Sequence, residues 1–139
     1  AGVLGAAFLL ALAWRLGWRI GLPADTARGP RRMALILGLD PSLSCTGWGV
    51  IRSEGSRLTH IANGQIKTDP KAPMADRLAA LQSGIAAVIA EHQLDRAAAE
   101  EVFVNKNPQS TLKLAQARGA VLAACGAAGL AVNEMLHAK

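Results

Sequence analysis

The chain has 139 residues, of which 51% are hydrophobic and 4% aromatic, which is enough apolar material for one folded domain with tails. Its net charge of +5 would suggest a nucleic-acid partner. However, residues 1–32 contain five Arg and one Asp, so they account for most of that excess and the rest of the chain is almost neutral. The two cysteines, Cys45 and Cys125, form no Cys-x-x-Cys motif, which argues against a zinc or redox centre.

The amino-terminal segment does not match the pattern of the remainder. Residues 1–14 form an uncharged apolar run, which is shorter than the roughly 20 residues of a membrane-spanning helix, and basic residues follow it. A signal peptide would carry its basic residues first. Met33 directly precedes the first predicted strand, so we predict that residues 1–32 are a separate extension, such as upstream or neighbouring-gene sequence, and that residues 33–139 form the domain. A membrane anchor is the less favoured alternative.

From Met33 onwards, short apolar runs alternate with turn residues and then with helical patterns. Leu78, Leu81, Ile85 and Val88 recur at helical spacing, Asn107-Pro108 is typical of a helix start, and Gly129 is typical of a helix end. The predicted elements, in chain order, are strands at about 34–40, 46–53 and 57–67, a helix at 74–92, a strand at 96–103, a helix at 108–128 and a strand at 130–135. This order predicts an α/β domain whose fourth strand runs parallel to the first.

Two strands from distant parts of the chain end in acids. Asp40 ends the first strand, and a carboxylate at the tip of a buried strand is costly unless it meets a cation or a donor. The alternative is that Asp40 only opens a turn, because Asp-Pro is common turn chemistry. Glu100 and Glu101 end the fourth strand, and strands of an open α/β sheet often assemble a site at their carboxyl ends.

Three motifs together resemble the RuvC family of Holliday junction resolvases, over the range from Met33 to about Glu134. They are Leu-Gly-Leu-Asp-Pro at 37–41 with the glycine-rich 46–51, the acidic Glu-Glu-Val-Phe at 100–103, and Lys106-Asn107 leading into 112–119. The first motif alone also occurs in the sugar kinase and actin group. Ser42 departs from the family, which more often has Gly there. Since Ser adopts a positive φ less readily than Gly, that turn could have a different shape here.

The resemblance implies an RNase H-like fold with a five-stranded mixed sheet in the order 3-2-1-4-5. It implies a cytoplasmic hydrolase that cuts four-way junction DNA, works as a homodimer, and associates with a branch-migration helicase complex. The residues that it points to are Asp40 and Glu100 as catalytic and metal-binding acids, Phe103 as a wedge on which a base stacks, and Lys106, Lys113 and Arg118 as DNA contacts. The basic residues on the second helix could equally form a solvated face, and Phe103 could be an ordinary core residue.

Two nearby carboxylates repel each other, and a hard divalent cation such as Mg²⁺ relieves that repulsion. We therefore expect the carboxylates of Asp40 and Glu100 to lie within roughly 4–7 Å, as in a two-metal site. Glu101 should face the other way, because neighbouring residues of a strand alternate. The family carries two further acids on a final helix, which is not found here, so the chain is expected to be an incomplete copy that does not cut junctions by itself.

Two other functions remain open from the sequence. The domain could bind nucleic acid or dimerise without cutting. It could also bind a nucleotide in the manner of the kinase and actin group, although that would require a second phosphate loop and a second domain.

Overall fold

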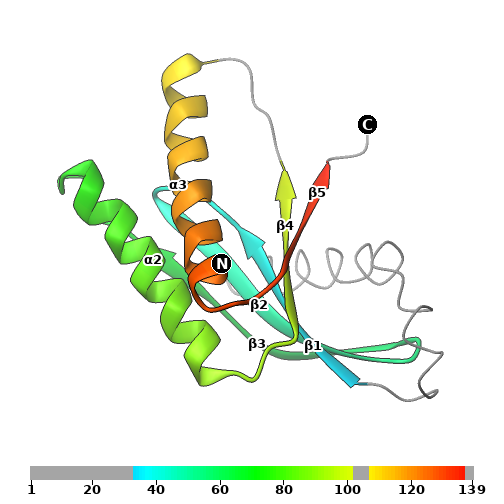
Figure 1. Cartoon of the computed structure of the whole chain (residues 1–139). Coiled ribbons are helices and arrows are strands. Elements are labelled where there is room, and N and C mark those ends of the chain that lie inside the picture. The colour runs from blue at the N-terminus through cyan, green and yellow to red at the C-terminus, as the bar shows by residue number, and fades with distance from the viewer. Residues whose placement is uncertain (1–32, 102–106, 137–139) are drawn as a thin grey trace.

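The computed structural model describes residues 33–101 and 107–136, and of Glu100, Glu101, Met135 and Leu136 it describes the backbone alone. Five strands and two helices make up this part of the chain (Figure 1). In chain order they are β1 (Met33–Asp40), β2 (Cys45–Glu54), β3 (Arg57–Lys67), α2 (Met74–Glu91), β4 (Arg96–Glu101), α3 (Pro108–Ala127) and β5 (Val132–Leu136).

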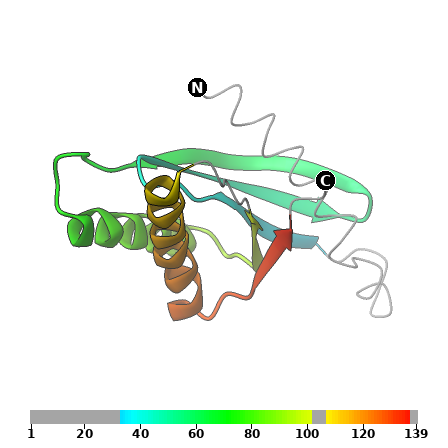
Figure 2. The same cartoon turned by 90° about the horizontal axis from the view of Figure 1, so that it is seen from above.

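The strands form one mixed sheet in the order β3-β2-β1-β4-β5. β1, β2 and β3 form an antiparallel meander, whereas β4 pairs in parallel with both β1 and β5. The two helices lie together on one face of this sheet, as the view from above shows (Figure 2). The predicted α/β class, the strand order and the parallel pairing of the first and fourth strands are therefore confirmed.

Most predicted boundaries agree with the observed ones to within two residues. The helix α3 begins as expected, because the Asn107 side chain accepts a hydrogen bond of 2.9 Å from the Gln109 N–H and Pro108 follows it. It ends at Ala127, Gly129 then takes a positive φ of 73°, and the Leu130 N–H donates to the Cys125 carbonyl. This closing turn uses Leu130, and for that reason β5 starts at Val132 rather than at residue 130.

Two predictions fall outside the described residues. β4 was expected to reach residue 103, and the described strand ends at Glu101. Residues 1–32 are likewise not described, so their separation from the domain stays a prediction. Within residues 33–101 and 107–136, neither helix is long and apolar enough to cross a membrane.

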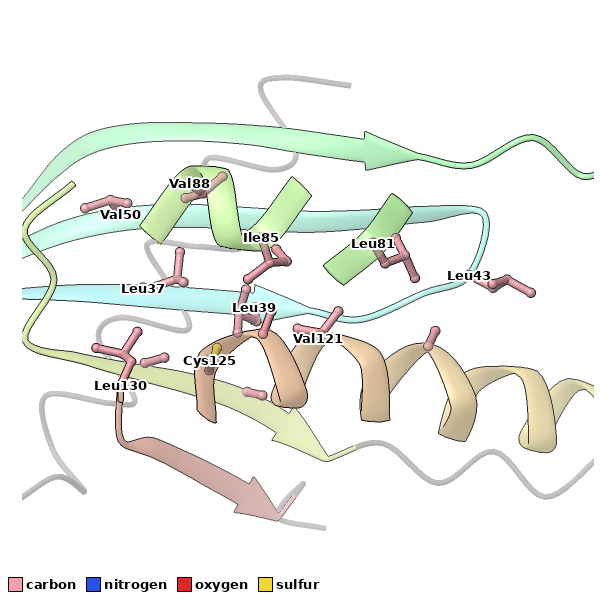
Figure 3. Close-up of a cluster of buried hydrophobic side chains, with 14 residues drawn as sticks. Leu37, Leu39, Leu43, Val50, Leu81, Ile85, Val88, Val121, Cys125 and Leu130 are labelled. Atoms are coloured by element: carbon pink, nitrogen blue, oxygen red, sulfur yellow. The ribbon is translucent and has the colours of Figure 1, made fainter. Parts of the chain in front are cut away.

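The main hydrophobic core fills the space between the sheet and the two helices (Figure 3). Alternate residues of β1, Leu37 and Leu39, face this core and are fully buried. The helix α2 contributes Leu81 and Ile85, and α3 contributes Val121 among others. Residues of β1 and β2 with the opposite alternation form a smaller cluster on the other face, which consists of Ala34, Ile36 and Ile51 with Leu58 beside them. The strand alternation therefore assigns every residue of β1 to one of two faces.

Trp48 on β2 lies against a glycine of the neighbouring strand. It pairs in register with Gly64 on β3, and a Cβ added at Gly64 would stand 2.6–2.9 Å from three atoms of the indole ring. Such a distance requires the ring or the strand to move. Gly64 is thus needed for the close approach of the ring, and not for an unusual backbone angle.

We expect Gly64→Ala to lower the free energy of unfolding by about 1–3 kcal/mol, because the added methyl group overpacks a rigid ring. Urea unfolding followed by circular dichroism measures this change. The control is Asn63→Ala, an exposed neighbour in the same strand, which should change stability little. Combining Gly64→Ala with Trp48→Leu should cost less than the sum of the two single changes, and strict additivity would contradict the proposed clash.

The core also contains one ionisable thiol. Cys125 is fully buried, and this burial raises its pKa from 9.0 to about 11. Between these two values the unfolded chain loses the thiol proton and the folded chain keeps it. The stabilising contribution of the buried thiol is therefore complete below pH 9 and disappears as the pH rises towards 11.

Accordingly, the stability of the protein should fall between pH 9 and pH 11 more steeply than that of a Cys125→Ala variant. Urea unfolding at a series of pH values gives both slopes. A thiol reagent at neutral pH should label Cys45, which is only half-buried, well before Cys125. Equal pH slopes for the two proteins would contradict the assignment.

Candidate active site

The site expected from the sequence lies where β1 and β4 end side by side. The parallel register pairs Leu37 with Ala97 and Leu39 with Ala99, and all four of these residues belong to the core under the helices. One step further along each strand are Asp40 and Glu100. Because alternation continues along a strand, positions 40 and 100 belong to the face away from the helices, and position 101 belongs to the helix face.

The choice of Glu100 over Glu101 stays a prediction. The predicted distance between the two carboxylates stays a prediction, because the side chain of Glu100 lies outside the described part of the chain. Asp40 itself is exposed. Its partner in register on the neighbouring strand β2 is Gly47. A Cβ added at Gly47 would be 3.7 Å from the Cβ of Asp40. A small residue thus stands directly beside the carboxylate.

The turn that follows Asp40 is closed by a buried threonine. Thr46 is fully buried, its hydroxyl donates to the Ser42 carbonyl over 2.6 Å, and the same oxygen accepts from the Ser42 N–H over 3.1 Å. One side chain therefore satisfies two backbone groups that the turn would otherwise leave without a partner. The structure also resolves the question raised by Ser42, because no described residue other than glycine has a positive φ. Ser can occupy this turn without backbone strain.

The predicted DNA-contacting residues divide into two groups. Phe103 and Lys106 lie outside the described residues. Lys113 is exposed on α3, whereas Arg118 is mostly buried and donates to the Glu134 carboxylate on β5 over 2.7 Å. The sequence analysis did not foresee this ion pair. An Arg that already joins a helix to a strand is a weaker candidate for phosphate binding than an exposed Lys.

Among the described side chains, no group of three or more His, Cys, Asp or Glu gathers in one place. Asp40 is the described carboxylate that the register places at the ends of β1 and β4. The amino-terminal end of α3 lies at the same end of the sheet as the tips of β4 and β5 (Figure 1). The chain therefore brings an acid, a helix amino terminus and Lys113 to one end of the molecule.

Sequence reasoning missed three polar residues next to this site, namely Thr46, Thr68 and Arg77. A signal for Arg77 was present, because it precedes Leu81 and Ile85 by four and eight positions and so shares the buried stripe of α2. A charged residue on an apolar stripe is unusual enough to indicate a specific partner.

Comparison with known proteins shows what the chain is similar to. Residues 36–138 match the family model described as crossover junction endodeoxyribonuclease RuvC. The chain belongs to the RuvC family. A RuvC of Erythrobacter litoralis is 78% identical over 102 residues, and this match covers 73% of the chain and 63% of the relative. A RuvC of Sphingopyxis alaskensis is 68% identical over 100 residues, with coverages of 72% and 64%.

Solved RuvC structures share the fold. The chain superposes on Thermus thermophilus RuvC with a TM-score of 0.67 and 27% identity, over 73% of this chain and 63% of that one. The same protein in complex with a Holliday junction substrate gives a TM-score of 0.68 at 24% identity, over 74% and 64% of the two chains. The RNase H-like fold that the resemblance implied is therefore confirmed. The chain spans somewhat less than two thirds of the length of these relatives.

Proposed function

We propose that this domain is the amino-terminal part of a metal-dependent endonuclease that cuts four-way DNA junctions. The observation that carries the proposal is the parallel register of β1 and β4, which makes Asp40 and Glu100 neighbours at the strand ends. Membership of the RuvC family supports the junction as the substrate. The RuvC relatives named above carry this activity in their names.

The donor chemistry of the site fits a hard cation. Carboxylate oxygens from two adjacent strand ends, together with a substrate phosphate, are the ligands that Mg²⁺ prefers. Such a metal would activate water and stabilise the leaving oxygen of a phosphodiester. In this proposal, Asp40 and Glu100 hold and orient the metal, and the small Gly47 beside Asp40 leaves room for a DNA strand.

The surroundings of the site supply contacts for DNA. Lys113, exposed on α3, is placed to contact a phosphate. We also assign Phe103 and Lys106 to the junction, since they follow Glu100 closely in the chain and precede α3. We assign Arg118 a smaller part in DNA binding, because it already pairs with Glu134. A branch-migration helicase partner stays an expectation from the family resemblance.

The cleavage test uses a chimera in which residues 33–136 of this chain replace the matching part of the Erythrobacter litoralis relative. With Mg²⁺, the chimera should cut a synthetic four-way junction at symmetric positions. Asp40→Asn and Glu100→Gln should each reduce the rate by at least about a hundredfold, because a displaced metal misaligns the reacting atoms.

The matched control in this experiment is Glu101→Gln, which removes the same charge one position away and should retain most of the activity. Loss of cleavage in Glu101→Gln with retention in Glu100→Gln would reverse the assignment. A chimera that binds the junction but never cuts it would favour the alternative of a non-catalytic binding domain.

The exposed side of α3 supports the second part of the proposal, a homodimer. Residues opposite the buried side of this helix are small, and Leu112 at one end of the row is 60% exposed. The exposed row consists of Leu112, Ala115, Gly119, Ala123 and Gly126. Small residues allow two helices to approach closely, and an exposed Leu gains from being covered. We propose that a second copy of the chain packs here.

Gly119→Arg should therefore convert the protein from a dimer to a monomer in analytical ultracentrifugation, because a long charged side chain would stand in the contact. Apart from the neighbouring residues and backbone of α3 itself, no described atom lies within 4 Å of a Cβ at Gly119, so the folded monomer should tolerate the change. Gln82→Arg, on the exposed side of α2, is the control and should leave the dimer intact. A dimer that survives Gly119→Arg would place the interface elsewhere.

A further inference from the structure

A chain of hydrogen bonds runs from the helix α2 to the turn that follows Asp40. The Arg77 Nε donates to the Thr68 hydroxyl oxygen over 2.9 Å, and the Thr68 hydroxyl donates to the Leu43 carbonyl over 2.5 Å. The Thr68 N–H also donates to the Ser44 carbonyl over 3.2 Å. Two successive carbonyls of the turn are thus held from outside the turn, by one residue at the end of β3.

Arg77 is costly at this position. It is only 9% exposed, and within the described residues no acid pairs with it. Removing a guanidinium from water without an ion-pair partner is unfavourable. Among the residues that the structure describes, Thr68 is the only hydrogen-bond partner of its side chain. A neutral side chain would pack in this stripe at a smaller cost, so the bond to Thr68 needs an explanation beyond packing.

The numbers of donors and acceptors on the two side chains explain what the bond between Arg77 and Thr68 does. A guanidinium only donates, whereas a Thr hydroxyl has one proton and can also accept. Because Arg77 donates to the Thr68 oxygen, the Thr68 proton must point to another acceptor, and the Leu43 carbonyl is that acceptor. Arg77 therefore sets the direction of the Thr68 hydroxyl. The charge on Arg77 should also strengthen the second bond by polarising the hydroxyl.

Leu43, whose carbonyl accepts the bond from Thr68, is close in the chain to the candidate catalytic acid. Leu43 follows Asp40 by three positions, and its side chain is buried in the main core, where Figure 3 shows it beyond the tip of β1. Its carbonyl is held by Thr68 while its side chain is held by the core. Pro41, between Asp40 and Ser42, is also buried. The backbone that leaves Asp40 is thus restrained at each step, although Asp40 itself is exposed.

We infer that Arg77 and Thr68 are positioning residues for Asp40, acting through the turn at residues 42–46. The inference rests on the proposed function, in which the Asp40 carboxylate must be held in one orientation towards a cation. Without the Arg77 bond, the Thr68 hydroxyl can rotate to other acceptors, the turn gains freedom, and Asp40 samples more than one orientation. Arg77 does not need to touch DNA or metal for this role.

The first test observes Asp40 directly, in the chain without metal or DNA. The probe is the ¹³Cγ resonance of Asp40 in protein labelled at Asp, assigned by its loss in Asp40→Asn. Arg77→Met and Thr68→Val should each shift or broaden this signal, and the double variant should add little to either. Thr68→Ser, which keeps the hydroxyl, should leave the signal at its parent position.

The second test measures junction cleavage in the chimera with the Erythrobacter litoralis relative. Arg77→Met and Thr68→Val should lower kcat by about ten- to a hundredfold, as expected for a misplaced catalytic group, with KM for the junction unchanged. Thr68→Ser should recover most of the rate. A residue that only stabilised the fold would change the unfolding temperature and leave kcat unchanged well below that temperature.

The outcomes separate the two proposals. An unchanged Asp40 signal in folded Arg77→Met, or a changed signal with an unchanged kcat, overturns the positioning role. If Arg77→Met does not fold, the comparison of Thr68→Val with Thr68→Ser decides instead, since both keep Arg77. If the parent chimera does not cut junctions, the proposed function fails, and the Asp40 signal alone decides whether Arg77 and Thr68 position that carboxylate.

Discussion

The parallel pairing of β1 with β4 is the constraint on which the rest of this domain depends. Parallel neighbours need a crossover, and α2 supplies it by returning the chain across one face of the sheet. The same pairing carries Leu37, Leu39, Ala97 and Ala99 into one buried layer beneath the helices. As a consequence, the next residue of each strand, Asp40 in β1 and Glu100 in β4, comes at adjacent positions of the sheet. The burial that stabilises the fold thus also determines the register of the site.

The site depends on buried polar groups as well as on apolar packing. Asp40 is exposed at a strand tip, and the backbone on either side of it is restrained. On one side this backbone is a strand of the sheet, and on the other it is a turn bonded to Thr46 and Thr68. Both threonines satisfy carbonyl groups that water would otherwise compete for. The turn is thereby restrained through neutral hydroxyl groups.

The helix α3 combines several roles in a single element of small residues. Its buried side packs on the core through Val121 and Cys125, and Arg118 ties it to β5 through Glu134. Its opposite side exposes the row that we assign to a second copy of the chain. In the proposed dimer, one helix carries the contact with the second copy on one side and packs on the core with the other.

The sequence by itself determined the elements, their order and the acids at the strand ends. Periodicity, turn residues and the cap at Asn107 are local signals, and a local signal is read from neighbouring residues alone. The family motifs added the strand order and favoured Glu100 over Glu101, and alternation along β4 predicted that these two acids point to opposite faces. Tertiary structure decided what depends on residues that are distant in the chain. It paired Arg118 with Glu134, and it joined Arg77 to Leu43 through Thr68, because a polar partner is chosen by proximity in the fold.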